Sequence, residues 1–264
     1  MQRHHRPPAG GPPPPVTWSR AAVAVAAPLA LLGMAAIPAN AQPAAPRHAP
    51  LQHAIGHGPL ADRDTSGNWA GYVVTGASKS FTSVESTFAL PTVGCSGGEG
   101  DTSFWVGFDG DTSNSVEQIG ASGDCNGTTP SYYAWWEMYP AGVHELSNTT
   151  KPGDVFDAKV TYGGSGKYTL YLKNKTEGWT VTKNETSTSA KDNSAEVIFE
   201  AAGPETDAVP KFSPVSMSGN TVNGKSLAAE TTTSIDLVRN GDTLVTPGSI
   251  SSSGSFSFTW HAAS

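Results

Sequence analysis

A short run of aromatic residues around a single acid, residues 132–140, carries the most distinctive chemistry of the chain. Aromatic side chains favour strands, and successive side chains of a strand point to opposite faces. One face would hold Tyr132, Ala134, Trp136 and Met138 and be apolar. The other face would hold Tyr133, Trp135, Glu137 and Tyr139. A carboxylate among three aromatic rings predicts the floor of a groove that binds a ligand.

Two further strand-like stretches place polar groups on one face in the same way. In residues 104–109 the even positions are apolar, and Trp105 and Asp109 lie opposite them on either side of Gly107. In residues 195–201, Glu196 and Glu200 share one face with an apolar residue between them. Several carboxyl groups could therefore face a common groove.

Histidine is nearly absent from the part of the chain that could fold into a domain, where only His144 and His261 occur. A serine or cysteine triad needs a well-placed base, and a zinc hydrolase needs a histidine cluster. If the protein is a hydrolase, carboxyl groups must carry its acid–base chemistry.

Asp64-Thr65-Ser66-Gly67 and Asp111-Thr112-Ser113 look like the turns of an aspartic protease. Those enzymes need two carboxyl groups that share a proton, each on a turn after an apolar strand. Asp64 instead follows a stretch rich in Pro, Ala and His, and the chain is short for two such lobes. The sequence therefore argues against this interpretation.

Four motifs occur in a fixed order along the chain. They are Trp105-Val106-Gly107, Glu117-Gln118-Ile119-Gly120, Trp135-Trp136-Glu137-Met138-Tyr139-Pro140 and Ala195-Glu196-Val197-Ile198-Phe199-Glu200. In this order the chain resembles the glutamic peptidases, the eqolisin family of acid proteases. The resemblance begins at Asn68-Trp69-Ala70-Gly71-Tyr72-Val73 and runs nearly to the C-terminus.

The resemblance implies a catalytic pair. Glu200 falls where the family has its general base, and Gln118 falls where it has the partner glutamine. A carboxylate could take a proton from the attacking water, and an amide N–H could stabilise the oxyanion without titrating in acid. Five further residues fall on groove positions, with Glu137 as support for Gln118 and Trp135 and Tyr139 packing against substrate: Trp69, Trp105, Trp135, Glu137 and Tyr139.

The chain departs from the family pattern at two places. Tyr133 stands where family members often carry Asp, and Ala201 stands after the catalytic glutamate where they carry Asp. Both changes remove a carboxylate near the site, so they bear on substrate preference and pH optimum. Other interpretations also stay open: Trp69 or Trp105 as core residues, Glu137 and Glu200 as solvated strand residues, and Glu196 in place of Glu200.

The elements that must position these residues are short strands. From residue 66 onward, strand-like runs alternate with Gly, Ser, Asn, Asp and Pro, and no amphipathic helix is evident. Residues 168–173 and 178–181 are typical of a hairpin, and residues 209–217 are expected to form one strand. Such spacing predicts a single-domain all-β sandwich or barrel. The family resemblance implies two curved antiparallel sheets with a concave substrate groove.

The first 64 residues are not expected to belong to the domain. Residues 1–41 have a basic leading region, an apolar run and a small-residue exit, which predicts a secretory signal peptide rather than a membrane anchor. Residues 42–64 are expected to form a propeptide or a loose arm, and residues 65–264 the peptidase domain. We therefore expect a secreted, extracellular protein that is not held at a membrane once the signal is cleaved.

Charge and cysteine content limit the partners. Loss of Arg3, Arg6 and Arg20 with the signal leaves 13 basic residues against 23 acids, a net charge of about −10, which does not suggest nucleic acid as a partner. Cys95 and Cys125, the only cysteines, are expected to form a disulfide in an oxidising compartment. They would make a poor metal site, so we expect no metal or other cofactor. A polypeptide substrate and a monomeric state are expected.

The leading hypothesis is a secreted acid endopeptidase of the glutamic type. Two other classes remain open. An aromatic groove on a secreted sandwich could bind carbohydrate, or Glu137 and Glu200 could form the carboxyl pair of a glycoside hydrolase. A catalytically silent relative is the fourth possibility.

Overall fold

A computed structural model describes residues 63–111 and 113–264. The predicted signal peptide and almost all of the predicted arm lie outside these residues. The described part is all-β, as predicted, and its only helical turns are two short 3-10 turns at Cys95–Gly97 and Leu227–Ala229. None of its helical segments has the length and apolarity to cross a membrane.

The strands follow one another closely along the chain. In chain order they are β1 (Arg63–Ser66), β2 (Trp69–Thr75), β3 (Ser83–Ala89), β4 (Val93–Gly94), β5 (Ser103–Phe108), β6 (Val116–Asn126), β7 (Thr129–Tyr139), β8 (His144–Glu145), β9 (Val155–Tyr162), β10 (Lys167–Asn174), β11 (Trp179–Thr186), β12 (Ser194–Glu200), β13 (Lys211–Phe212), β14 (Val215–Val222), β15 (Lys225–Ser226), β16 (Thr233–Arg239), β17 (Asp242–Pro247) and β18 (Phe256–Trp260).

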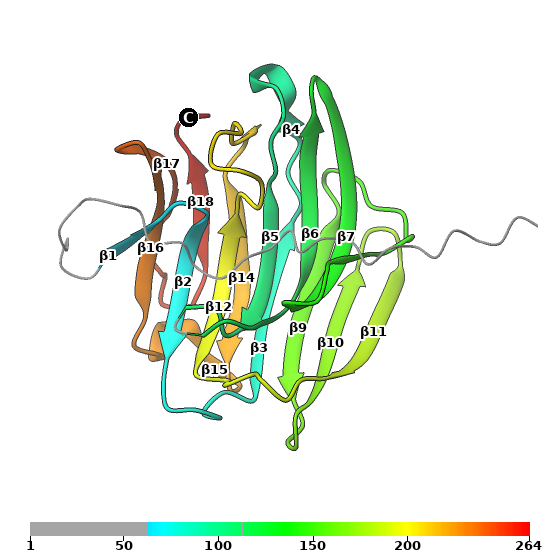
Figure 1. The fold of residues 1–264 in the computed structure, drawn as a ribbon, viewed down its shortest axis with the longest axis vertical. Coiled ribbons are helices and arrows are strands. Elements are labelled where there is room, and N and C mark those ends of the chain that lie inside the picture. Colours follow the sequence, from blue (N-terminus) through cyan, green and yellow to red (C-terminus); the bar gives the residue numbers. More distant parts are fainter. Residues whose placement is uncertain (1–62, 112) are drawn as a thin grey trace, which may run out of the picture. The chain divides into compact units, whose positions relative to one another are not determined.

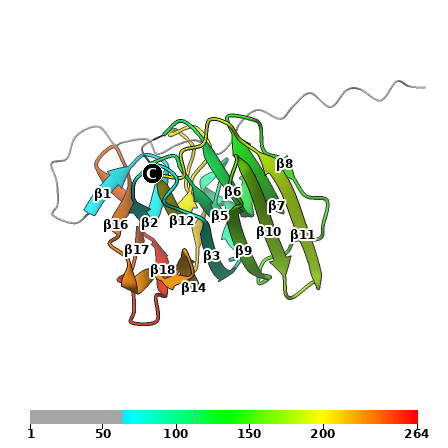
Figure 2. The ribbon, with the colours of Figure 1, turned by 90° about the horizontal axis from the view of Figure 1, so that it is seen from below.

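The strands form two layers that are joined along one edge (Figures 1 and 2). The first layer has the order β11-β10-β9-β3-β14, and the second has the order β16-β2-β12-β5-β6-β7-β8. Strands β18 and β17 connect β14 to β16, so hydrogen bonding continues from one layer into the other. Strand β5 lies against β3 and β9, and β6 lies against β9 and β10, which makes a sandwich.

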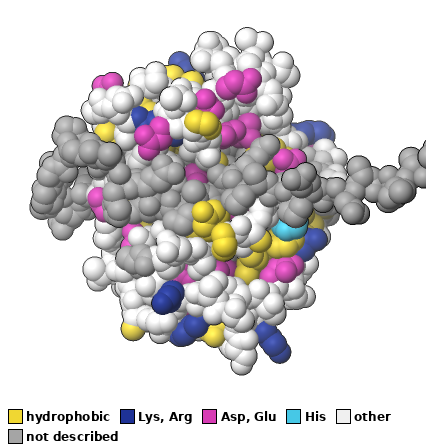
Figure 3. Space-filling model, in the orientation of Figure 1, with side chains coloured by type: hydrophobic (Ala, Val, Ile, Leu, Met, Phe, Trp, Pro, Cys, Tyr) yellow, Lys and Arg dark blue, Asp and Glu magenta, His cyan; other side chains and the backbone are white. Residues whose placement is uncertain are grey.

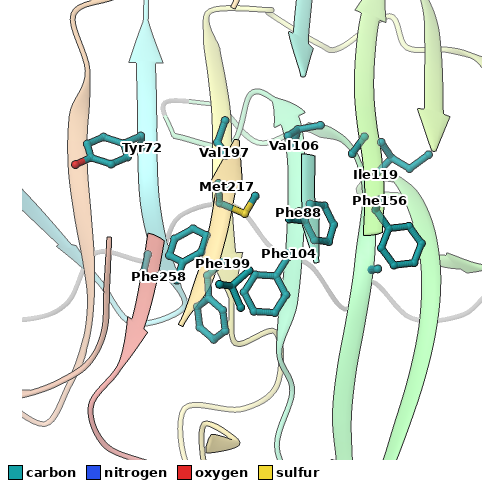
Figure 4. Packing of buried hydrophobic residues seen from close by; sticks show 14 of the residues in the cluster. Tyr72, Phe88, Phe104, Val106, Ile119, Phe156, Val197, Phe199, Met217 and Phe258 are labelled. Carbon is teal, nitrogen blue, oxygen red and sulfur yellow. The ribbon is translucent and has the colours of Figure 1, made fainter. Parts of the chain in front are cut away.

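A core of apolar side chains fills the space between the layers. Phenylalanine rings dominate it, with Phe104 of β5 5.4 Å from Phe199 of β12 and Phe88 of β3 5.7 Å from Phe156 of β9 (Figure 4). In the first layer the burial alternates along the strands, because one face meets this core and the other meets solvent. In the second layer β2, β5, β6 and β12 are buried on both faces. The outer face of this layer therefore also holds buried side chains, which makes it the candidate location of a site.

Several sequence predictions are confirmed. Strands β10 and β11 form the predicted hairpin, with Asn174 paired to Trp179. Cys95 and Cys125 form the predicted disulfide, with their Cα atoms 5.3 Å apart. Along β7, Ala134 belongs to the inter-layer core while Trp135 belongs to a separate cluster on the outer face, as the alternation predicted.

Residues 209–217 do not form the single predicted strand. They divide into β13, which pairs with β4, and the start of β14, which pairs with β3 and β18. Pro214 lies between the two, and because proline has no N–H it interrupts the ladder there. The parallel pair β1–β16 was also not anticipated, and it begins within the predicted arm at Arg63.

Candidate active site

The outer face of the second layer gathers all the predicted site residues. Trp69 lies on β2, Glu200 on β12, Trp105 on β5 and Gln118 on β6, and Trp135, Glu137 and Tyr139 lie on β7. Their positions alternate with core-facing residues in every strand, so they share one face. Five adjacent strands thus contribute side chains to a single surface.

The strand register defines the layout of this surface. Glu200 pairs with Trp69 on one side and with Ser103 on the other, and Ser103 pairs with Ser122. Gln118 precedes Ser122 on β6, with Gly120 facing the same side between them, and it pairs with Glu137. Glu200 and Gln118 therefore lie diagonally across β5 rather than on neighbouring positions.

Glu200 is fully buried, and two side-chain donors hold its carboxylate. The indole Nε1–H of Trp105 donates to Oε2 at 3.0 Å, and the amide of Asn68 donates to Oε1 at 3.5 Å. Asn68 is itself held, because Ser66 Oγ donates to its side-chain oxygen at 2.7 Å. Donors of this kind favour the charged form of a buried carboxyl group, which a general base requires.

Trp105 can bridge the diagonal because glycines flank it. A Cβ atom at Gly120 would lie 2.6 Å from Cβ of Trp105, and one at Gly107 would lie 3.1 Å from Cζ3 of its ring. Gly107 pairs with Gln118, so one end of the indole reaches Glu200 and the other end lies above the neighbour of Gln118. The two glycines make room for the indole at the centre of the face.

Gln118 is also fully buried and is oriented by a carboxyl group. Its side-chain nitrogen donates to Oε2 of Glu137 at 2.9 Å. This is the placement that the sequence interpretation gave to Glu137 as a supporting group. The hydrogen bond uses one of the two N–H groups of the amide and leaves the other for a ligand.

Hydrogen bonding distinguishes Glu196 from Glu200, the two glutamates that the sequence offered as candidates for the base. Glu196 lies on the same face, and it is equally buried. Neither of its carboxylate oxygens accepts a hydrogen bond from the described part of the chain. Burial raises the pKa of Glu196 well above its usual range. Burial thus favours the neutral form of Glu196, whereas the carboxyl group of Glu200 has side-chain donors.

The tryptophans form an aromatic cluster on the site face, separate from the inter-layer core. Trp69 meets Trp105 edge to face at 5.0 Å, and its indole N–H finds no acceptor among the described residues. Trp135 donates to Ser122 Oγ at 2.8 Å. Tyr139 is half-buried at the edge of this cluster. Trp69 and Trp105 are both fully buried, as the core alternative required. They lie in the cluster on the site face, however, and not in the core between the layers.

Several residues of this face were missed by the sequence analysis. Asn68 contacts Glu200 directly. Ser122, which accepts from Trp135, shares a 2.6 Å hydrogen bond with Ser103, and Ser103 is the strand neighbour of Glu200. The buried guanidinium of Arg239 donates to the carbonyls of Gly67 at 2.7 Å and Ala201 at 3.3 Å, which ties together the segments beside Asn68 and Glu200. Asn68 had a signal, because it is the first residue of the stretch at which the family resemblance begins. The serines and Arg239 had none.

Tyr133, the departure from the family pattern, takes part in a different contact. Its hydroxyl donates to Asp124 at 2.6 Å. Both residues line a pocket of about 660 Å³, to which Ala202, just after Glu200, also contributes. Five acidic residues line this pocket: Glu99, Asp101, Asp124, Glu145 and Asp207. Asp and Glu side chains gather in the upper part of the face that Figure 3 shows. The site face therefore continues into an acidic pocket at the Glu200 end.

The chain is similar to known peptidases in sequence and in fold. It is 30% identical over 142 residues to Aspergillopepsin-2 of Aspergillus niger, a match that covers 46% of this chain and spans half the length of that relative. Scytalido-glutamic peptidase, solved with a transition state analog inhibitor, matches with a TM-score of 0.62 and 23% identity over 74% of this chain and 98% of its own. SCP-B, an eqolisin solved with the tripeptide Ala-Ile-His, matches with a TM-score of 0.59 and 22% identity over the same shares.

These likenesses support the predicted fold, a sandwich of antiparallel sheets. The family assignment rests on a longer stretch of sequence. The Peptidase A4 family matches residues 67–260, which include every residue of the site face described above. The chain therefore belongs to the Peptidase A4 family, the family of glutamic peptidases that its four motifs resemble.

Proposed function

We propose that this protein is a secreted endopeptidase that cleaves polypeptides in acid, with Glu200 as the general base and Gln118 as the oxyanion donor. The observation that carries the proposal is the pair of buried contacts that orient the two groups. Trp105 and Asn68 hold the Glu200 carboxylate, and Glu137 holds the Gln118 amide. Both side chains lie on one face of the second layer, and this family consists of peptidases.

The reaction follows from these two groups. The Glu200 carboxylate takes a proton from a water molecule, and the oxygen of that water forms a bond to the carbonyl carbon of the scissile peptide. The carbonyl oxygen gains negative charge and accepts the second N–H of Gln118. The Glu200 carboxyl group then returns its proton to the peptide nitrogen as the carbon–nitrogen bond breaks. The products are a free acid and a free amine, and Glu200 ends as it began.

Two unsatisfied groups on the face suit a peptide ligand. The oxygen of the Gln118 amide and the indole N–H of Trp69 are buried, and neither has a hydrogen-bond partner among the described residues. A buried polar atom without a partner costs about 1–3 kcal/mol. A water molecule or a substrate backbone could satisfy both, so these atoms are suited to binding rather than to packing.

The glycosidase alternative gains no support from the register. A glycosidase needs two carboxyl groups that flank one bond. Glu137 is engaged by Gln118, and strands β5 and β6 separate its strand from that of Glu200. Gln118 would also have no role in such an enzyme.

Digestion of an unfolded protein between pH 2 and pH 7, followed by mass spectrometry of the fragments, tests the proposal. We expect internal cleavage in acid that Glu200→Gln abolishes and a chelator leaves unchanged. Glu196→Gln is the matched control, because Glu196 lies on the same strand face and glutamine imitates the neutral form that burial favours there. Full activity in a folded Glu200→Gln protein, or retention on a glycan column without any cleavage, would contradict the proposal.

A further inference from the structure

A second group of acids lies buried close to β6. Carboxylate oxygens of Asp109, Glu117 and Asp192 lie within 4.8 Å of one another, and all three residues are buried. Glu117 is on β6 next to Gln118, but it pairs with core-facing neighbours, Phe108 and Met138, so its side chain is on the opposite side of the strand. None of the three has a role in the proposed reaction.

Asp109 is well supplied with hydrogen-bond donors. Its two oxygens accept the backbone N–H groups of Lys191 at 2.7 Å, Asp192 at 3.0 Å and Asn193 at 3.1 Å. The hydroxyl of Ser115 donates as well, at 3.3 Å. Backbone donors converging on one carboxylate stabilise its charged form. Only one of these four bonds ends on Oδ1, which leaves that oxygen able to accept another donor.

Asp192 has a donor on each of its carboxylate oxygens. Lys79 donates to Oδ2 at 2.8 Å, and the hydroxyl of Tyr168 donates to Oδ1 at 2.6 Å. Lys79 brings a compensating positive charge, so the pair needs no further cation. A metal ion at this place would compete with the positive charge of Lys79 for Asp192.

Glu117 differs from both. Its side chain is fully buried, and neither oxygen accepts a hydrogen bond from any residue in the described part of the chain. A buried carboxylate without donors next to two other carboxylates is strongly disfavoured. A neutral Glu117 instead has an O–H group to donate, and the oxygens of Asp109 lie close to it.

We propose that Glu117, Asp109 and Asp192 form a buried proton-binding site, and that the proton it holds on Glu117 ties the folded state to acidic conditions. On loss of this proton, three buried carboxylates would be balanced only by the ammonium group of Lys79, whose side chain is exposed. Because Glu117 and Gln118 are adjacent on β6, the resulting repulsion would act on the strand that carries the proposed oxyanion donor. The site would make the protein stable in acid and labile in alkali.

The direction of the pH dependence follows from the proton affinity. Burial, and then the charge of Asp109, raises the pKa of Glu117 from 4.5 to about 9. The contribution of this proton to stability is complete below pH 4.5 and is lost as the pH rises through 9. Other titratable or charged groups near Glu117 are Asp192, Lys79, Tyr168 and Glu196, and Asp111 acts on Glu196.

Equilibrium unfolding of the full chain in urea between pH 5 and pH 9 tests the inference. For one retained proton, the unfolding equilibrium constant rises up to about tenfold per pH unit. In Glu117→Gln, which keeps a donor for Asp109 without the titration, we expect a slope lower by about one proton and higher stability than the parent at pH 8. Glu85→Gln is the matched control, since Glu85 is a half-exposed glutamate paired with Lys159 on the neighbouring strand. This control should keep the slope of the parent.

Three results would overturn the inference. One is an unchanged slope in a folded Glu117→Gln protein. Another is stabilisation of the parent by Ca²⁺ at pH 7 that Glu117→Gln lacks, which would assign the site to a cation. If Glu117→Gln does not fold, infrared spectroscopy of Glu196→Gln decides, because this variant lacks the other buried glutamate whose pKa is raised: the band of a neutral carboxyl group must persist at pH 7 and disappear as the pH rises through about 9. Absence of that band at pH 7 is the third.

Discussion

Glu200 and Glu117 occupy two regions with the same burial and different chemistry. Both side chains are fully buried, that of Glu200 on the site face of the second layer and that of Glu117 on the core-facing side of β6. Glu200 receives N–H donors from Trp105 and Asn68, whereas Glu117 receives none from the described residues. The donors, rather than the depth of burial, determine which carboxyl group can carry a charge. One acid is thereby suited to catalysis and the other to holding a proton.

The largest expected effect separates the two glutamates by activity. Glu200→Gln should lower kcat/KM for a peptide substrate in acid by at least about 10³-fold, because the base is lost. Glu117→Gln should leave the activity in acid close to that of the parent, because Glu117 is already neutral there. Steady-state kinetics on both variants, with circular dichroism to check folding, makes this comparison. Equal losses in the two variants would end the distinction between the regions.

A second variant tests the partner of the base. Gln118→Ala should lower kcat by about 10²–10³-fold, which is the usual effect of removing one oxyanion donor. KM should change less, because this hydrogen bond strengthens in the transition state. Glu137 would lose the amide that contacts it, so stability should be measured in parallel. A large rise in KM with an unchanged kcat would show that Gln118 only binds substrate.

A third variant tests whether donors make Glu200 differ from Glu117. Trp105→Phe keeps an aromatic ring but removes the N–H that lies 3.0 Å from Glu200. A hydrogen bond to a charged group contributes about 1.5–3 kcal/mol, so we expect a loss of about tenfold to a hundredfold. The loss should fall on kcat more than on KM, because this N–H orients the base and not the substrate. A rise in KM with an unchanged kcat would indicate a packing defect of the groove instead.

Much of this arrangement could be predicted from the sequence where the signal is local. The alternation along residues 132–139 places Trp135 and Glu137 on the site face correctly, because a strand has a period of two. The order of the four motifs predicts Gln118 and Glu200, which the register brings to one face. The roles of these residues remain predictions until kinetics tests them.

The remainder depends on contacts between distant strands. Ser103, Ser122 and Arg239 are ordinary residues in sequence, and only the pairing of β5, β6 and β12 and the course of the chain around Glu200 give them a place. Glu117 did carry a signal, since it shares its strand face with the core residue Ile119. An acid at a core-facing position is a buried polar group that needs an explanation. The proximity of Asp109 and Asp192, which supplies one, requires the fold.

The smallest expected effect concerns the space that lets Trp105 reach Glu200. A Cβ atom at Gly107 would lie 2.9 Å from the backbone oxygen of Glu117, 3.0 Å from Cβ of Gln118 and 3.1 Å from the Trp105 ring, so Gly107→Ala should push β6 outward and tilt the indole away from Glu200. We expect a loss of several-fold in kcat/KM and about 1–3 kcal/mol in stability from overpacking. Gly94→Ala on β4 is the matched control, because its new Cβ would approach other atoms no closer than 3.7 Å. If Gly107→Ala loses stability without losing activity, the indole contributes packing alone, and the contrast between Glu200 and Glu117 would have to rest on Asn68.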